Sequence, residues 1–172
     1  MLNEFNLIAA RIAAALKDRR EKIAVADGAT GGLISASLLT VPGALKFFVG
    51  GGIVYSFKAR DVMFALPRGA YEGMQSATPE YALLQARAIR ERFGVAWGIA
   101  ESGSAGGSTH PLGVPSGQSC CAVVGPGIER VRVSETHNDD RIANMALFTR
   151  NALELLDETL ALDQGAISPA FG

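Results

Sequence analysis

Several residue types on which common sites depend are scarce in this sequence. Its 172 residues include two cysteines and two histidines, and no His, Cys, Asp or Glu spacing matches a metal-binding motif, so we expect no metal and no cofactor. His110 and His137 stand in different segments and are expected on the surface. Cys120 and Cys121 are adjacent in an apolar run, where neighbouring strand residues point to opposite faces, so a disulfide between them would be strained. These features predict a reduced, cytoplasmic protein.

An excess of charge of either sign is also missing. The 16 Lys and Arg residues nearly balance the 17 Asp and Glu residues, so the sequence predicts no nucleic-acid partner. No run reaches the roughly 18 apolar residues of a membrane span. The first residues carry apolar side chains at helical spacing together with Glu4, a pattern typical of a helix and not of a signal peptide. We therefore expect no membrane partner, one domain over residues 1–162 and a flexible tail over 163–172.

Short apolar runs alternate with helical patterns along the chain. Strands are expected at 22–26, 45–55, 95–100, 118–124 and 128–135, and helices at 2–16, 31–39, 58–66, 78–93 and 139–162. This order predicts an α/β fold, a three-layer sandwich with a mixed, mostly parallel sheet covered by helices on both faces. Ligands of such folds bind beyond the carboxyl ends of the strands, so the segments after residues 26, 55 and 100 are expected to meet at one edge. Residues 101–117, rich in Gly, Ser and Pro, form a loop long enough to suggest a function.

The turn Asp27–Gly32 connects the first buried strand to a helix. It has neither the lysine of a P-loop nor the spacing of a dinucleotide fingerprint. Backbone N–H groups at a helix start can bind an anion, and glycines let a ligand approach closely. The alternative is that Gly31 and Gly32 only allow tight packing of the strand against the helix, and glycines alone favour that alternative.

Polar residues follow two other strands. Glu101, with Ser102 beside it, comes directly after an apolar run and is placed to act as a general base, although a helix cap or an ion-pair partner is an equally simple explanation. Lys58 and Arg60 follow the strand that ends near Tyr55, and they could hold a phosphate or a carboxylate. A solvated helix face is the simpler explanation for either cation alone.

Several segments, taken together, resemble the CinA C-terminal domain family over about residues 21–156. They are ADGATGG at 26–32, VPGA and FFVGGGIVYS within 41–56, GIAESGSAGG at 98–107, PSGQSCCAVVG at 115–125, ANMALF at 143–148 and ALELL at 152–156. The resemblance implies nicotinamide-nucleotide amidohydrolysis. In that reaction a serine activated by a lysine converts the carboxamide of nicotinamide mononucleotide to the carboxylate and ammonia.

The sequence departs from the family pattern where that reaction needs its groups. The position of the family's nucleophilic serine falls on Gly28, so no nucleophile is assigned, and the lysine position falls on Arg60, whose guanidinium stays protonated. Glu101 stands where the family has a hydroxyl. The resemblance implies Glu101, Tyr55 and Arg60 as catalytic residues. It implies a substrate site made of Asp27, Gly28, Ala29, Thr30, Gly31, Gly32, Ser56, Ser102, Gly103 and Ser104.

Two interpretations of this departure stay open. In the first, the domain is an enzyme of weak or altered amide hydrolysis, in which Glu101 activates water, the turn after Asp27 supplies oxyanion donors and Arg60 binds a phosphate. In the second, catalysis is lost and the domain binds an anionic small molecule such as a pyridine nucleotide. Both interpretations predict a small-molecule anionic ligand, and we further expect a homo-oligomer.

Overall fold

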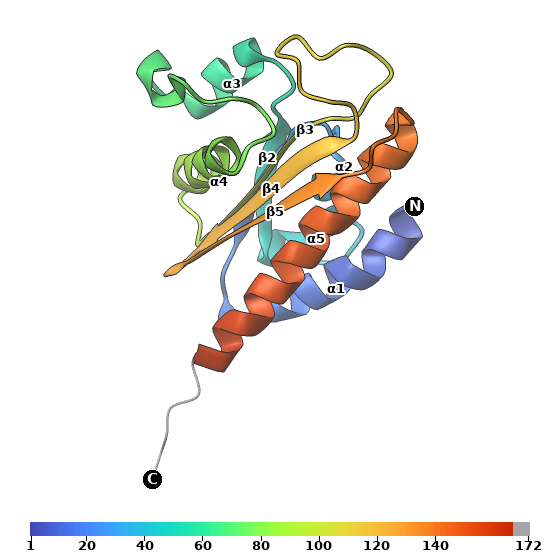
Figure 1. Ribbon diagram of the computed structural model, residues 1–172. Helices are drawn as coiled ribbons and strands as arrows, with labels where there is room; N and C mark the ends of the chain where they lie inside the picture. The colour runs from blue at the N-terminus through green and yellow to red at the C-terminus, as the bar shows by residue number, and fades with distance from the viewer. Residues whose placement is uncertain (167–172) are drawn as a thin grey trace.

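The computed structural model describes the backbone of residues 1–166 and the side chains of residues 1–67 and 69–163. Helices cover both faces of one central sheet (Figure 1), which confirms the predicted three-layer α/β architecture. One face is covered by α1 (Leu2–Arg19), α2 (Leu33–Leu39) and α5 (Arg141–Ala166). The other is covered by α3 (Phe57–Phe64) and α4 (Pro79–Phe93).

The sheet has the strand order β2-β1-β3-β4-β5. Its strands are β1 (Ile23–Asp27), β2 (Phe48–Ile53), β3 (Trp97–Ser104), β4 (Gln118–Gly125) and β5 (Ile128–Glu135). β1 runs parallel to β2 and β3, whereas β3 pairs with β4 and β4 with β5 in antiparallel fashion. The mixed sheet is thus evenly divided, since two of its strand pairings are parallel and two are antiparallel.

Both faces of the sheet are buried, so the central strands are apolar throughout. In β1, Ile23 and Val25 pack toward α1 and α5, and Ala24 and Ala26 pack toward α4. The same alternation sends the neighbouring thiols of β4 to opposite cores, where both cysteines are free and buried. Helix α4 starts as its sequence predicts, with Pro79 at its first position.

The two largest differences from the expected element boundaries are at the ends of β3 and α5. The strand predicted at 95–100 continues to Ser104, because its polar end pairs in register with β4 from Gly98 to Ser104. Helix α5 begins at Arg141 and continues through Ala166, so residues 163–166 of the expected tail are helical. The rest of that expected tail lies outside the described residues.

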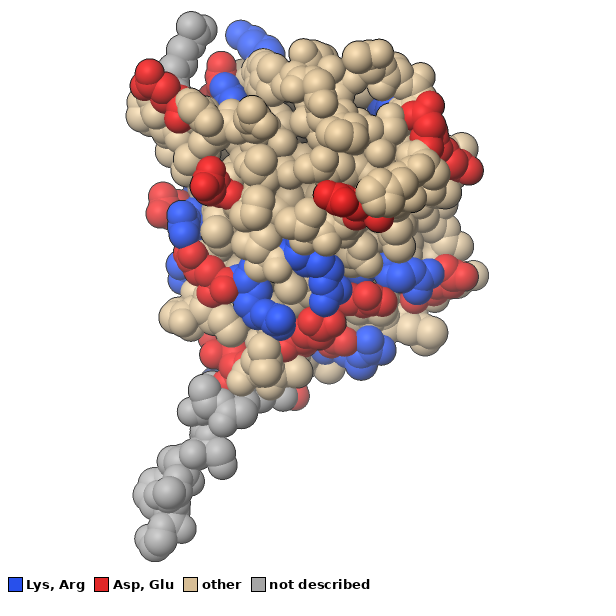
Figure 2. All heavy atoms as spheres, viewed as in Figure 1, with Lys and Arg blue, Asp and Glu red and all other residues tan. Residues whose placement is uncertain are grey.

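The surface carries both signs of charge. In the view of Figure 2, basic and acidic side chains alternate in a band across the lower part of the face, and the upper part is largely uncharged. Ion pairs such as Arg87–Glu129 and Arg132–Glu158 bridge neighbouring elements. Within the described part of the chain, no helix is both long and apolar enough to span a membrane.

Strand β2 lies at the edge of the sheet and contains three consecutive glycines. The pairing of β1 with β2 contains a bulge, because Ile23 pairs with Phe48 and the next residue of β1 pairs with Gly50. Val49 and Ile53 of this strand are exposed apolar side chains. The homo-oligomer expected from the sequence stays a prediction.

Candidate functional site

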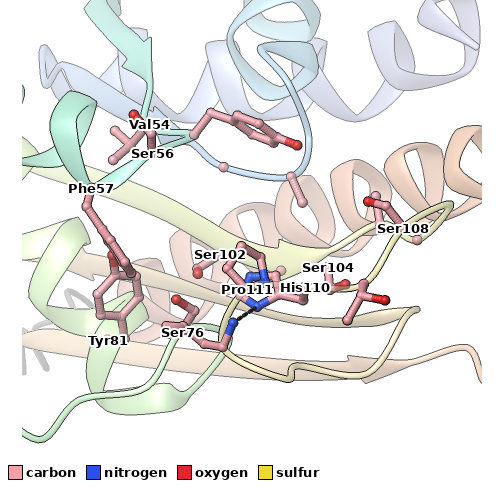
Figure 3. Close-up of a pocket in the computed structure, with 18 of the residues that line it drawn as sticks. Val54, Ser56, Phe57, Ser76, Tyr81, Ser102, Ser104, Ser108, His110 and Pro111 are labelled. Atoms are coloured by element: carbon pink, nitrogen blue, oxygen red, sulfur yellow. Dashed lines mark hydrogen bonds between the residues drawn. The ribbon is translucent and has the colours of Figure 1, made fainter.

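A pocket of about 400 Å³ opens at the carboxyl ends of the three parallel strands. Its walls come from segments far apart in the sequence, namely residues 28–29, 54–57 and 102–106 together with the loop 108–112 (Figure 3). The prediction that the segments after the first three strands meet at one edge is thus confirmed. The volume lies in the range of pockets that hold small molecules.

The described residues that line this pocket are rich in hydroxyl groups and include no carboxylate. Apolar walls are formed by Val54, Phe57 and Leu112. The hydroxyl-bearing side chains are Tyr55, Ser56, Ser76, Tyr81, Ser102, Ser104, Ser108 and Thr109. The described lining residues include Arg141 but no Asp or Glu. The pocket therefore favours a polar ligand with negative charge.

Asp27 lies behind the pocket, completely buried at the end of β1. Its Oδ1 accepts hydrogen bonds from the Thr30 hydroxyl at 2.8 Å and the Ile34 N–H at 3.0 Å. Its Oδ2 accepts from the Ser35 hydroxyl at 2.7 Å and the Ser35 N–H at 3.2 Å. The carboxylate therefore satisfies the first turn of α2, where the helix dipole favours a negative charge.

Glu101 is also completely buried, beneath the same turn and in the middle of β3. Its Oε2 accepts from the Thr30 N–H at 3.0 Å, and its Oε1 accepts from the Ser119 hydroxyl at 2.6 Å. Burial raises the pKa of the Glu101 carboxyl, and the nearby charge of Asp27 adds to the rise, whereas the hydrogen bonds from Ser119 and Thr30 oppose it. The expected position of Glu101 after the strand, facing the pocket, is wrong, because β3 continues past it.

The turn between Gly28 and Gly32, expected to cradle an anion, gives some of its N–H groups to acceptors of the chain itself. Thr30 and Ile34 give their N–H groups to the two buried carboxylates, and the N–H of Gly31 donates to the carbonyl of Gly28 at 3.1 Å. Of the predicted binding turn, Gly28 and Ala29 line the pocket, whereas Asp27, Thr30, Gly31 and Gly32 are not among the lining residues. Binding of an anion at this turn stays a prediction.

Gly28 leaves no room for a side chain. An added Cβ would lie 2.2 Å from the Glu101 carbonyl oxygen and 3.2 Å from Glu101 Oε2. Close packing of the turn against β3 therefore explains why this position holds glycine. The sequence suggested tight packing only for Gly31 and Gly32, whereas the structure shows it at Gly28 as well.

Arg60 does not line the pocket. Its guanidinium lies 3.7 Å from the ring centroid of Tyr71 and 4.8 Å from that of Phe57, and it donates to Asp61 Oδ1 at 3.1 and 3.2 Å. A cation that stacks on an aromatic ring and is paired with a carboxylate is not free to hold a phosphate in the pocket. The sequence could not show this, since Tyr71 approaches Arg60 only through the tertiary fold.

The remaining predicted residues lie where the sequence places them. The pocket is lined by Tyr55, Ser56, Ser102, Gly103 and Ser104. Two of the serine hydroxyls accept backbone N–H groups, Ser56 from Ala59 at 3.1 Å and Ser102 from Ala77 at 3.1 Å. Each therefore keeps its own O–H free to donate to a ligand.

Arg141 and His110 are among the pocket residues that sequence reasoning missed. Arg141 lines the pocket from the first position of α5, donating from Nη1 to the Gly106 carbonyl at 2.7 Å and from Nη2 to the Tyr55 hydroxyl at 3.1 Å. A cation in the first turn opposes the helix dipole, and this anomaly is the signal that could have identified it. His110, expected on the open surface, also lines the pocket; burial lowers the pKa of its imidazole, and its Nδ1 accepts the Leu112 N–H at 3.1 Å (Figure 3).

Comparison with known proteins gives a family model that matches most of the chain. Residues 6–160 match the model described as "CinA C-terminal domain". A CinA-like protein of Myxococcus xanthus is 32% identical over 140 residues, which are 80% of this chain and 33% of that protein. A CinA-like protein of Desulfosudis oleivorans is 32% identical over 153 residues, 88% of this chain and 37% of that protein. The chain thus spans about a third of the length of these curated relatives.

Solved structures share the fold. A competence-damaged protein (CinA) superfamily protein from Klebsiella pneumoniae superposes with a TM-score of 0.83 at 24% identity, covering 91% of this chain and 98% of that one. A protein of the same superfamily from Escherichia coli gives a TM-score of 0.81 at 21% identity, with 90% of each chain covered. At these identities the likeness establishes the architecture.

Proposed function

The chain belongs to the CinA C-terminal domain family, and from this premise we propose that it binds a nucleotide-like anionic small molecule and hydrolyses nicotinamide mononucleotide negligibly. The family resemblance suggests the ligand class, and the pocket suggests what remains of the chemistry. Because the match covers only about a third of the length of the curated relatives, the activities of those whole proteins are not assumed for this domain.

The close contact between Gly28 and β3 carries the proposal. Attack on a carboxamide by a serine requires a hydroxyl at the position that Gly28 occupies, together with a base to activate it. A Cβ at Gly28 would overlap the Glu101 carbonyl oxygen. The group at the expected base position, Arg60, remains protonated and is stacked on Tyr71.

Hydrolysis through an activated water lacks support for a related reason. A general base must come within hydrogen-bond distance of the water it activates. Glu101 is completely buried, both of its oxygens accept hydrogen bonds from the chain, and it is not among the residues that line the pocket. The arrangement suits a carboxyl group that holds the turn in place.

Binding is supported by the lining itself. Phe57 offers an aromatic surface to a ring, and the serines beside it offer donors and acceptors to ribose-like hydroxyls. Arg141 and the absence of carboxylates among the described lining residues favour a negative charge. A mononucleotide combines these three features in one molecule.

The proposal is tested by titration calorimetry with nicotinamide mononucleotide, nicotinic acid mononucleotide and inorganic phosphate, and by an ammonia assay on the first of these. We expect saturable heat with a mononucleotide and no ammonia above the uncatalysed background. Gly28→Ser, alone or combined with Arg60→Lys, is expected to release none either, because the new Cβ has no space.

Two results would contradict the proposal. Turnover by the wild type at ordinary enzyme rates, roughly 1–10³ per second, would show that another group supplies the nucleophile or the base. The absence of both heat and a thermal shift with every one of these anions would show that the pocket does not bind this class of molecule.

A further inference from the structure

We infer that Arg141 recognises the negative charge of the ligand, in an anion subsite bounded by Arg141, the Tyr55 hydroxyl and the Gly106 carbonyl. This inference rests on the proposed binding function and specifies where the ligand's charge is held. Of the two anion sites expected from the sequence, the start of α2 already donates N–H groups to the buried Asp27, and Arg60 is paired with Asp61.

The donors of Arg141 are only partly used. A guanidinium has five N–H groups. One nitrogen donates to the Gly106 carbonyl at 2.7 Å and another to the Tyr55 hydroxyl at 3.1 Å. These two contacts fix the plane of the group and leave N–H groups available for an anion. A guanidinium held in this way can meet two oxygens of a phosphate or carboxylate at once.

The charge of Arg141 is not neutralised by a neighbouring acid. No carboxylate pairs with it among the residues whose side chains the structure describes, in contrast to Arg60 and Arg132. The two acids that precede it in the chain face backbone groups: Asp139 accepts the Gly107 N–H at 2.8 Å, and Asp140 accepts the Ala143 N–H at 3.0 Å. A ligand oxygen would therefore meet an uncompensated cation.

The walls of the subsite are held in place by a buried amide. Asn144 is completely buried, and its Nδ2 donates to the Ala105 carbonyl at 2.9 Å and the Asn138 carbonyl at 3.1 Å. Its Oδ1 accepts from the Thr136 hydroxyl at 2.7 Å. The amide thereby joins the segment just after β3, which carries Gly106, to the start of α5, which carries Arg141. Such preorganisation reduces the ordering cost of binding.

The subsite lies toward one end of the pocket. Gly106 stands between Ser104 and Ser108 in the chain, and Figure 3 shows Ser104 and Ser108 on the opposite side of the pocket from Phe57 and Tyr81. We therefore expect the ligand's anionic group near Arg141 and its ring near the two aromatic side chains.

The test compares two probes that differ by one phosphate, nicotinamide mononucleotide and nicotinamide riboside, by calorimetry on the wild type and on Arg141→Gln. Loss of a charge-assisted hydrogen bond is expected to weaken mononucleotide binding at least about tenfold and to leave riboside binding within about twofold. Arg141→Lys, which keeps the charge but not the planar fork, is expected to fall between wild type and Arg141→Gln. Arg92→Gln is the matched control, because Arg92 is exposed and donates to a backbone carbonyl, that of Met63, outside the pocket.

The outcomes separate this inference from the function on which it rests. Equal weakening of both probes, or unchanged mononucleotide binding in Arg141→Gln, would overturn the inference alone. Failure of the wild type to bind either probe would overturn the proposed function and the inference with it. Thermal melting of each variant checks that the fold is retained.

Discussion

The substitution Gly28→Ala adds a single methyl group at the most crowded point of the site. The new carbon would lie 2.2 Å from the Glu101 carbonyl oxygen, whereas ordinary van der Waals contact begins near 3.4 Å. The turn or β3 must therefore move by about 1 Å, and overpacking of this kind costs roughly 1–3 kcal/mol in the free energy of unfolding. The obstacle is a main-chain oxygen, so no rotation of a side chain can relieve it.

The effect is measured by urea denaturation and thermal melting. For a chain of this size each kcal/mol lowers Tm by about 2–4 °C, so we expect Gly28→Ala to melt roughly 2–12 °C below the wild type. Gly69→Ala is the matched control, since a Cβ at Gly69 would meet nothing within 4 Å and neither glycine has a left-handed φ. Alanine in a compatible conformation usually stabilises a protein slightly, because the unfolded chain loses conformational freedom.

Equal stability of Gly28→Ala and Gly69→Ala would refute the reasoning. It would mean that the turn yields without cost, and the exclusion of a nucleophile at Gly28 would then lose its physical basis. A loss confined to Gly28→Ala would support it.

Three further predictions concern buried groups behind the pocket. Burial raises the pKa of Glu101 in the folded state, so the wild type should lose stability as the pH rises above about 4.5. Urea denaturation between about pH 5 and 8 should therefore show Glu101→Gln gaining stability relative to the wild type as the pH rises. A difference between the two proteins that does not change with pH would contradict this prediction. Burial raises the pKa of the Cys120 thiol to about 12, so both cysteines should resist a thiol-reactive chromophore until the protein is unfolded. Asp27→Asn, which replaces one accepting oxygen with a donor beside Ser35 or Thr30, should lower the free energy of unfolding by about 1–3 kcal/mol in the same assay, and an unchanged value would contradict it.

Local patterns predicted most of the fold. The apolar run at 22–26 predicted β1 to within one residue, the helical pattern at 78–93 predicted α4, and the runs at 118–124 and 128–135 predicted β4 and β5. Strands that are buried on both faces are apolar along their whole length, and caps and turns depend on residues next to one another. Such features are determined by a few consecutive residues.

The chemistry of the site was less accessible, because it depends on partners far away in the chain. Glu101 ends the apolar run, but Ser119 and Thr30 supply the hydrogen bonds that let its carboxyl group lie inside the sheet. From the sequence alone Arg60 resembles a free cation, because its stacking on Tyr71 arises only in the folded chain. The cation that does line the pocket, Arg141, comes from a helix at the other end of the sequence.

The pocket's walls extend from Gly28 to Arg141 along the chain, so no fragment shorter than that span can hold all of them. A ligand that contacts this complete set distinguishes the whole folded domain from any partly folded one. By mass action, a ligand at a hundredfold excess over its Kd would add about 2.7 kcal/mol to global stability. The same coupling slows proteolysis at loops far from the ligand, because cleavage that requires global opening must then also await release of the bound molecule.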